Sequence, residues 1–340
     1  MQPRRQAVSG RATRWAAPLA VLLGAWLAVF GAAAAPADAG VWLARLQQAA
    51  NLGNYQGTMV FSAGGVVSSS HVAHFRDGDQ DFERVEALDG RMHRVYRHND
   101  AVLTLWPQSR IAVQDRREPL AGLWSPMAPL EARALEQYSL KPLGTERIAG
   151  RDAQVVMLVP RDAYRYPQRF WTDLATGLML RVDVLGPGRE VLESAAFSEV
   201  EIGIRPQPDT VLVPMRHLDG YRVLRRPESA TRLEAEGWAL ASPVAGFRLA
   251  NCLKRPLPGD APEAAGASPV LQAVFSDGLT HVSLFVENFD PARHLAPLHT
   301  RIGATSTLMQ RQGEAWWLTA IGDVPLATLH QFAAALERRR

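Results

Sequence analysis

Residues 55–106 have the sequence YQGTMVFSAGGVVSSSHVAHFRDGDQDFERVEALDGRMHRVYRHNDAVLTLW, in which short runs of β-forming residues alternate with turn residues. The turns Ala63-Gly64-Gly65, Asp77-Gly78-Asp79 and Asp89-Gly90 are spaced like the hairpin loops of consecutive antiparallel strands. The runs at 55–61, 71–75, 91–97 and 101–106 therefore predict a meander. We expect its sheet to bury one face.

The segments on either side of this meander extend the same domain. Residues 41–52 (VWLARLQQAANL) have apolar residues at helical spacing and are followed by Gly53, which predicts an N-terminal helix. Residues 129–136 predict a short helix entered through proline, and strands resume between 147 and 202. Many antiparallel strands with few helices predict an α+β fold, a large antiparallel half-barrel with helices.

A second, smaller domain is expected near the C-terminus. Runs at 270–275, 281–287, 304–310 and 315–321 predict strands, and residues 325–336 predict a helix with one apolar face. Between them, residues 256–269 are rich in Pro, Gly and Ala, which is typical of a loop. We therefore divide the chain into a leader at 1–37, a first domain at 38–215, a linker at 216–236, and an antiparallel sheet-and-helix domain at 237–337.

The N-terminus has the order of a secretory signal peptide. Four arginines without an acid precede a long uncharged run, and small residues at Ala35–Ala39 offer the cleavage site. The apolar run is also long enough for an uncleaved anchor, and both alternatives place the body outside the cytoplasm, in the periplasm. Without residues 1–37 the chain has 33 basic and 34 acidic residues, so the basic surplus belongs to the leader and nucleic acid is not expected as a partner.

No catalytic, cofactor or metal motif stands out, so we expect neither an enzyme nor a bound cofactor. Cys252 is the only cysteine, which excludes an intrachain disulfide. His71 and His74 lie three apart on an expected strand and would point to opposite faces. Asp162 and Asp173 have arginine neighbours, which favours ion pairs over a raised-pKa acid.

Apolar side chains on the first domain give a functional hypothesis. They could line the concave side of a half-open sheet and hold an acyl chain, because methionine adapts to irregular ligands. The alternative is a filled core made by the same residues. The candidates are Met59, Phe61, Leu103, Leu105, Trp106, Trp124, Met127, Trp171 and Met179.

Several blocks taken together resemble the RseB/MucB family of periplasmic sigma-factor regulators. Each block alone is weak, but their shared order over nearly the whole mature chain is specific. The blocks are residues 55–61 (YQGTMVF), 147–151 (RIAGR), 160–166 (PRDAYRY), 170–173 (FWTD), 176–178 (TGL), 245–247 (AGF), 275–279 (FSDGL), 282–286 (VSLFV), 303–305 (GAT) and 321–325 (IGDVP).

The resemblance implies a lipid-sensing first domain similar to the lipoprotein carriers LolA and LolB, joined to a smaller sheet-and-helix domain. We expect this C-terminal domain to bind the anti-sigma factor. It implies that the protein binds the periplasmic segment of a transmembrane anti-sigma factor of the RseA/MucA type and shields it from proteolysis. Lipid or lipopolysaccharide would release that segment. For the partner-binding surface we expect Phe275, Asp277, Gly278 and Phe285, with docking by strand addition at a sheet edge.

Two alternatives to this function remain open. A lipid or lipoprotein carrier would use the same half-barrel, although such carriers lack a second domain. An enzyme acting on envelope glycan or lipid would depend on Asp162 or Asp173. The sequence leaves the oligomeric state open, a homodimer included.

Overall fold

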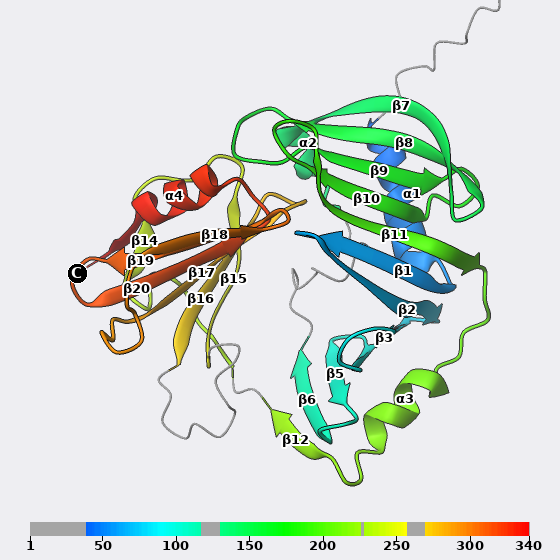
Figure 1. Ribbon diagram of the computed structural model, residues 1–340, viewed down its shortest axis with the longest axis horizontal. Coiled ribbons are helices and arrows are strands. Elements are labelled where there is room, and N and C mark those ends of the chain that lie inside the picture. The colour runs from blue at the N-terminus through cyan, green and yellow to red at the C-terminus, as the bar shows by residue number, and fades with distance from the viewer. Residues whose placement is uncertain (1–38, 117–129, 226–227, 257–268, 340) are drawn as a thin grey trace, which may run out of the picture. The chain divides into compact units, whose positions relative to one another are not determined.

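The computed structural model describes residues 39–116, 130–225, 228–256 and 269–339, all of which belong to one compact unit, Pro36–Arg340 (Figure 1). The expected leader and the loop at 256–269 therefore lie almost entirely outside the described residues. Within the described part, no helix has the length and apolarity needed to cross a bilayer.

The larger of the two main sheets is formed by the N-terminal two thirds of the chain. Its strands are β1 (Tyr55–Ala63), β2 (Val66–Asp77), β3 (Gln80–Ala87), β4 (Arg94–His98), β5 (Ala101–Trp106), β6 (Ile111–Arg116), β7 (Tyr138–Ile148), β8 (Arg151–Pro160), β9 (Gln168–Asp173), β10 (Met179–Leu185), β11 (Val191–Ile202) and β12 (Arg222–Arg225). They follow the order β12-β6-β5-β4-β3-β2-β1-β11-β10-β9-β8-β7, antiparallel except for the parallel pair β12 and β6.

Short turns set the register of this sheet. Gly64 and Gly65 both have positive φ, 57° and 84°, as a two-residue type I′ hairpin requires, and they join β1 to β2. Strand β1 pairs with β2 on one side and with β11 on the other, so it joins the early meander to the later strands. The large sheet is therefore continuous across 12 strands.

Two helices cover opposite faces of the large sheet. Helix α1 (Ala39–Leu52) packs Trp42 against Phe170 of β9, edge to face at 5.8 Å. Helix α3 (Asp209–Arg216) places Val211 in a cluster with Phe75 of β2 and Leu103 of β5. Since neighbouring residues of a strand point to opposite faces, the registers put Phe75 and Leu103 on the face away from α1.

The smaller main sheet is formed by the C-terminal part of the chain. Its strands are β13 (Ser229–Ala230), β15 (Arg248–Arg255), β16 (Val270–Ser276), β17 (His281–Asn288), β18 (Leu298–Ile302), β19 (Thr305–Gln312) and β20 (Trp316–Gly322), in the order β13-β15-β16-β17-β20-β19-β18. Short strands β14 (Trp238–Leu240) and β21 (Leu336–Arg338) form a separate pair.

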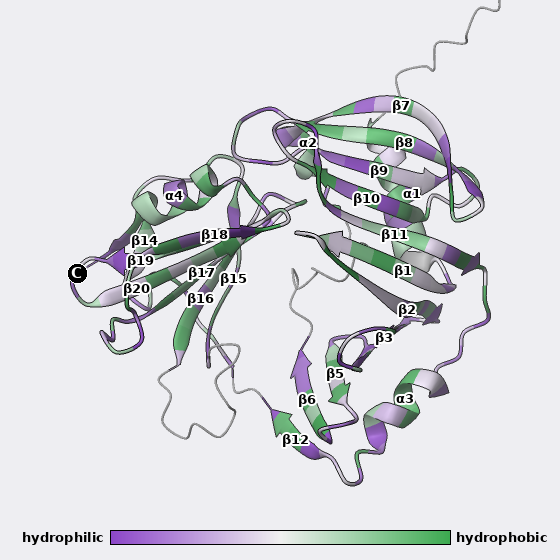
Figure 2. Cartoon of the chain, in the orientation of Figure 1, coloured by the Kyte–Doolittle hydropathy of each residue, from purple (hydrophilic) through white to green (hydrophobic). Residues whose placement is uncertain are grey.

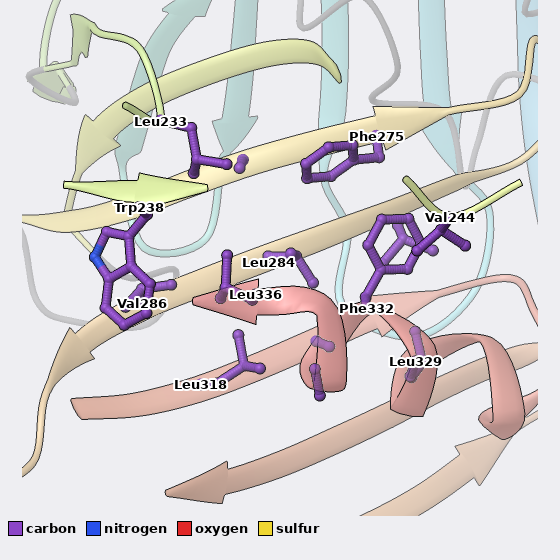
Figure 3. Close-up of a cluster of buried hydrophobic side chains, with 14 of the residues drawn as sticks. Leu233, Trp238, Val244, Phe275, Leu284, Val286, Leu318, Leu329, Phe332 and Leu336 are labelled. Atoms are coloured by element: carbon purple, nitrogen blue, oxygen red, sulfur yellow. The ribbon is translucent and has the colours of Figure 1, made fainter. Parts of the chain in front are cut away.

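Helix α4 (Leu326–Ala335) covers the small sheet and completes its core. Phe332 is fully buried and contacts Phe275 at 5.0 Å and Phe247 at 5.4 Å between ring centroids. Figure 3 shows Phe332 and Leu329 of α4 facing Phe275 and Leu284 from the strands. Removing a buried phenylalanine side chain costs about 3–5 kcal/mol, so this contact contributes a large share of the local stability.

The expected fold class, α+β with a large antiparallel sheet and a smaller sheet-and-helix part, is confirmed. Figure 2 shows hydrophobic and hydrophilic residues mixed along the strands, as the alternation of faces requires. The expected C-terminal helix is α4. The expected helix at 129–136 is instead the short α2 (Ala134–Gln137), which runs directly into β7.

The segment expected to be a linker, residues 216–236, contains two strands. Strand β12 joins the large sheet and β13 joins the small one. Helix α3, just before this segment, is not among the elements predicted from the sequence. Pro208 immediately precedes the helix and Pro214 lies in its last turn, so α3 forms in spite of them.

Candidate functional site

The candidate lipid-lining residues do not all lie on one face of the large sheet. Phe61 pairs with Ala195, Ala195 with Val182 and Val182 with Phe170, which places Phe61 on the face that carries α1. Met179 clusters with Trp42 of α1 and lies on this face too. By the same alternation, Met59, Phe61, Trp106 and Met179 share the α1 face.

Three other candidates lie on the opposite face. Leu103 and Leu105 belong to the cluster beneath α3. Trp171 follows Phe170 on β9 and so points away from the α1 face. The guanidinium groups of Arg169 and Arg181 lie 4.9 and 4.6 Å from its ring, and its Nε1 donates to Glu146 at 2.8 Å. Four of the nine lining candidates therefore share the α1 face, and three lie on the other face.

Trp124 and Met127, the last two lining candidates, fall outside the described residues. A pocket of about 560 Å³ lies elsewhere, in the C-terminal part, where Lys254, Glu287 and Arg293 contribute to its lining. None of the nine lining candidates borders it. An acyl-chain site on the α1 face therefore remains a proposal.

The expected partner-binding residues are all buried, and two of them, Asp277 and Gly278, lie at a junction between the two parts of the chain. Phe275 and Phe285 are 4% and 8% exposed and lie on interior strands β16 and β17. Gly278 has a φ of +98°, and an added Cβ would lie 3.0 Å from Arg133 Cγ. Because these residues pack inside the described chain, they form no exposed docking surface in this structure.

Asp277 is the centre of this junction. Its side chain is fully buried and accepts hydrogen bonds from Arg165 Nε at 2.5 Å and from Tyr138 Oη at 3.3 Å. The backbone amides of Leu279 and Thr280 donate to its other oxygen at 2.9 and 2.8 Å. A carboxylate from the β16–β17 turn is thus held by side chains from the large-sheet part.

Arg165 extends the junction from the other side. Its guanidinium donates to Ala245 O at 2.6 Å, pairs with Asp162 and lies 4.6 Å from the Phe247 ring. Burial alone would lower the pKa of Arg165, but hydrogen bonds and charges from Asp277 and Asp162 outweigh it and raise the pKa. Burial and Asp277 likewise raise the pKa of Tyr138 well above 10.

The acids considered for catalysis have structural partners. Asp173 accepts from Arg151 at 2.7 Å and from the Thr176 amide at 2.8 Å. Burial raises the pKa of Asp173, but these hydrogen bonds outweigh it and lower the pKa. Asp162 pairs with Arg165. A general acid needs a raised pKa, so Asp173 lacks that property.

His74, one of the two histidines considered as metal ligands, and Cys252 both have structural surroundings. His74 Nδ1 lies 2.8 Å from Gly53 O, and its ring stacks on Tyr55 at 5.2 Å. Among the described residues, no group of His, Cys, Asp and Glu side chains is arranged to hold a metal ion. Cys252 is buried, and this burial raises its pKa to about 11.

Glu193 is a buried acid that the sequence analysis missed. It lies on β11 with 8% exposure, pairs in register with Ala63 of β1 and accepts a hydrogen bond from the Ala304 amide at 3.0 Å. The signal was present in the alternation, because Glu193 shares a face with Ala195 and with buried Phe197. A charged residue on the apolar face of a strand indicates a specific contact.

Comparisons with known proteins match both parts of the chain. The model of the MucB/RseB N-terminal domain matches residues 38–215, and that of the MucB/RseB C-terminal domain matches residues 232–337. The sigma factor AlgU regulatory protein MucB of Pseudomonas aeruginosa is 28% identical over 323 residues, which cover 94% of this chain and 96% of that protein. The sigma-E factor regulatory protein RseB of Escherichia coli is 23% identical and covers 93% and 95%.

Solved structures of the same group are similar over most of the chain. The complex of Pseudomonas aeruginosa MucA and MucB contains a chain that matches with a TM-score of 0.69 at 26% identity, over 89% of this chain and 100% of that chain. A crystal structure of MucB in complex with MucA(peri) matches with a TM-score of 0.67 at 25% identity, with the same coverage.

Proposed function

Since the chain belongs to the MucB/RseB family, we propose that it is a periplasmic negative regulator of an envelope-stress sigma factor. It binds the periplasmic segment of a transmembrane anti-sigma factor and protects that segment from regulatory proteolysis. The observation that carries the proposal is the match over both parts of the chain, because the relatives are named sigma factor regulatory proteins. A MucB relative has been solved with MucA(peri) bound, which supports a partner of that kind.

The docking surface that the geometry favours is the free edge of strand β18. This strand ends the small sheet with β19 as its one neighbour, and all five of its residues are exposed. Leu298 is 53% and Ile302 66% exposed. An extended peptide can pair with the unpaired backbone groups of such an edge and place apolar side chains on these two residues.

The hydrogen-bond pattern of β18 supports a specific pairing with that peptide. Ile302 and Thr305 flank the two-residue turn at Gly303 and Ala304, so they form a hydrogen-bonded pair. In an antiparallel ladder, alternate residues direct their amide and carbonyl groups away from the partner strand. His299 and Arg301 therefore offer their backbone groups to an incoming strand.

Lipid binding would act through the α1 face of the large sheet. Met59, Phe61, Trp106 and Met179 share that face, and Phe61 and Trp106 are partly exposed. A lipid that binds only the partner-free form must weaken partner binding by the same factor as the partner weakens lipid binding. No enzymatic step is part of this function.

A pair of substitutions at one position tests the docking edge. His299→Pro removes the outward amide of β18, while His299→Ala keeps it. We expect His299→Pro to weaken the affinity for the periplasmic segment about tenfold and His299→Ala to change it less than threefold, because proline removes one ladder bond, worth about 0.5–1.5 kcal/mol, and about 1.4 kcal/mol corresponds to tenfold. Equal affinities for the two variants would exclude β18 as the docking edge.

A further inference from the structure

Glu193 fixes the turn between β18 and β19 against the end of β11. Its Oε1 accepts the amide of Ala304 at 3.0 Å, and the side chain lies so close to Gly303 that an added Cβ would be 2.6 Å from Oε1. The same added Cβ would be 3.0 Å from Ala63 Cβ. A residue of the large sheet and a turn of the small sheet thus meet with no space for another atom.

A second carboxylate binds the same turn through one hydroxyl. Thr305 Oγ1 donates to Asp323 Oδ1 at 2.6 Å, and Thr305 follows Ala304, whose amide donates to Glu193. Asp323 follows β20 in the turn that leads into α4. Two carboxylates, Glu193 of the large sheet and Asp323 of the small-sheet part, therefore bind neighbouring residues of one turn.

No described cation balances this pair of acids at Glu193. The charged group whose interaction raises the pKa of Glu193 is Asp323, while β1, β10 and the β18–β19 turn face it with Ala63, Val184 and Gly303. The contrast with Asp277 is plain, because that carboxylate lies against the Arg165 guanidinium. Two acids joined without a cation favour holding one proton between them.

A proton on Glu193 removes the repulsion between the two acids at this turn. Burial first, and then the charge of Asp323, raise the pKa of Glu193 to about 7, and together they outweigh the hydrogen-bond donors of Ala304 and Thr305, which lower it. Ionised Glu193 would carry its charge in a buried contact and repel Asp323.

We propose that Glu193, Thr305 and Asp323 form an acid-stabilised latch that holds the β18–β19 turn against β11 and weakens as the surrounding medium becomes less acidic. The sign follows from linkage. A carboxyl with a pKa of 4.5 when the contact is open and about 7 when it is closed stabilises the contact fully below pH 4.5 and loses that stabilisation as the pH rises through about 7.

The consequence for regulation rests on the proposed function, because β18 is the proposed docking edge. The latch decides whether the turn at the end of that edge is held against the large sheet, which carries the proposed lipid-binding face. Acidification would therefore couple the two sheets more tightly, and neutral medium would free the β18–β19 hairpin. The latch itself can be tested without any partner.

Hydrogen exchange of the Ala304 amide measures the latch directly in the full mature chain. After correction for intrinsic exchange, we expect its protection to fall by about two orders of magnitude between pH 4.5 and pH 7.5, since the shift of about 2.5 pKa units corresponds to about 300-fold. Glu193→Gln has no titrating proton at this position and should show no such fall. Glu199→Gln, an exposed acid on the same strand, should retain the wild-type profile.

Asp323→Asn provides a second variant if Glu193→Gln does not fold. It removes the neighbouring charge, so the pH-dependent fall in protection should be smaller than in wild type. Protection of Ala304 that is constant from pH 4.5 to 7.5 in wild type would overturn the latch, and so would a Glu193→Gln profile equal to that of wild type. Loss of partner binding with an intact latch profile would instead contradict the proposed function alone.

Discussion

Replacing Asp277 by alanine should be among the most destabilising single changes in the chain. The Asp277 side chain is fully buried and accepts from Arg165, Tyr138 and two backbone amides. Without it, the guanidinium of Arg165 stays buried beside Asp162 alone. Breaking one partner of a buried ion pair typically costs about 3–5 kcal/mol of the free energy of unfolding.

Urea unfolding followed by far-ultraviolet circular dichroism and tryptophan fluorescence gives the measurement. With a slope of about 3 kcal/mol per molar urea, Asp277→Ala should lower the midpoint by about 1–1.7 M. The matched control is Asp152→Ala, which removes an ion pair with Arg147 whose two side chains are each 70% exposed. That control should change the free energy by less than about 1 kcal/mol.

A double substitution separates the interaction energy of Arg165 and Asp277 from the general loss of packing. Arg165→Met combined with Asp277→Ala leaves no unpaired buried charge from this pair, so its cost should be smaller than the sum of the two single costs. An Asp277→Ala variant no less stable than Asp152→Ala would refute the role of the junction. Additive costs for the double variant would show that Arg165 and Asp277 do not act as a pair.

Three further outcomes follow from the same structure. Gly303→Ala should destabilise the chain by about 1–3 kcal/mol more than Gly313→Ala. Both glycines have positive φ, but of the two only Gly303 has atoms within 4 Å of an added Cβ. Equal melting temperatures of the two variants would contradict this. Ionisation of Glu193 should lower the free energy of unfolding by up to about 3.4 kcal/mol between pH 4.5 and 7.5. Glu193→Gln should remove this decrease from the pH dependence measured by urea unfolding. A pH dependence unchanged in Glu193→Gln would contradict the role of Glu193. Cys252, with a pKa of about 11, should react slowly with a thiol reagent at pH 8 in the native chain and fast in urea; rapid native labelling would show an accessible thiolate.

Local patterns predicted many elements of the fold, but not α3, β13 or β18. Apolar residues at helical spacing indicated α1 and α4, and glycine turns marked the hairpin from β1 to β2. These features depend on neighbours in sequence, so a single sequence contains them. Helix α3 was not predicted, although Pro208 precedes it and Pro214 lies in its last turn. The position of a proline in a helix, and not the number of prolines nearby, decides whether the helix forms.

The candidate sites depended on information that lies far apart in the chain. Leu103 and Met59 look equally apolar, but the register through β2, β3 and β4 puts them on opposite faces of the large sheet. Phe275 lies on β16, whose seven residues are all buried. The apolar run of β16 therefore indicates an interior strand and not an exposed binding surface. Arg165 and Asp277 are 112 residues apart, and no local pattern pairs them.

Titration of the mature chain with the periplasmic segment of its anti-sigma factor, in the presence and absence of lipopolysaccharide, tests the regulatory function most directly. We predict that the complex forms in the absence of lipid. Saturating lipid should lower the affinity of the chain for the segment, and the segment should lower the affinity for lipid by the same factor. Failure to form the complex, or an affinity unchanged at saturating lipid, would contradict the function proposed for this chain.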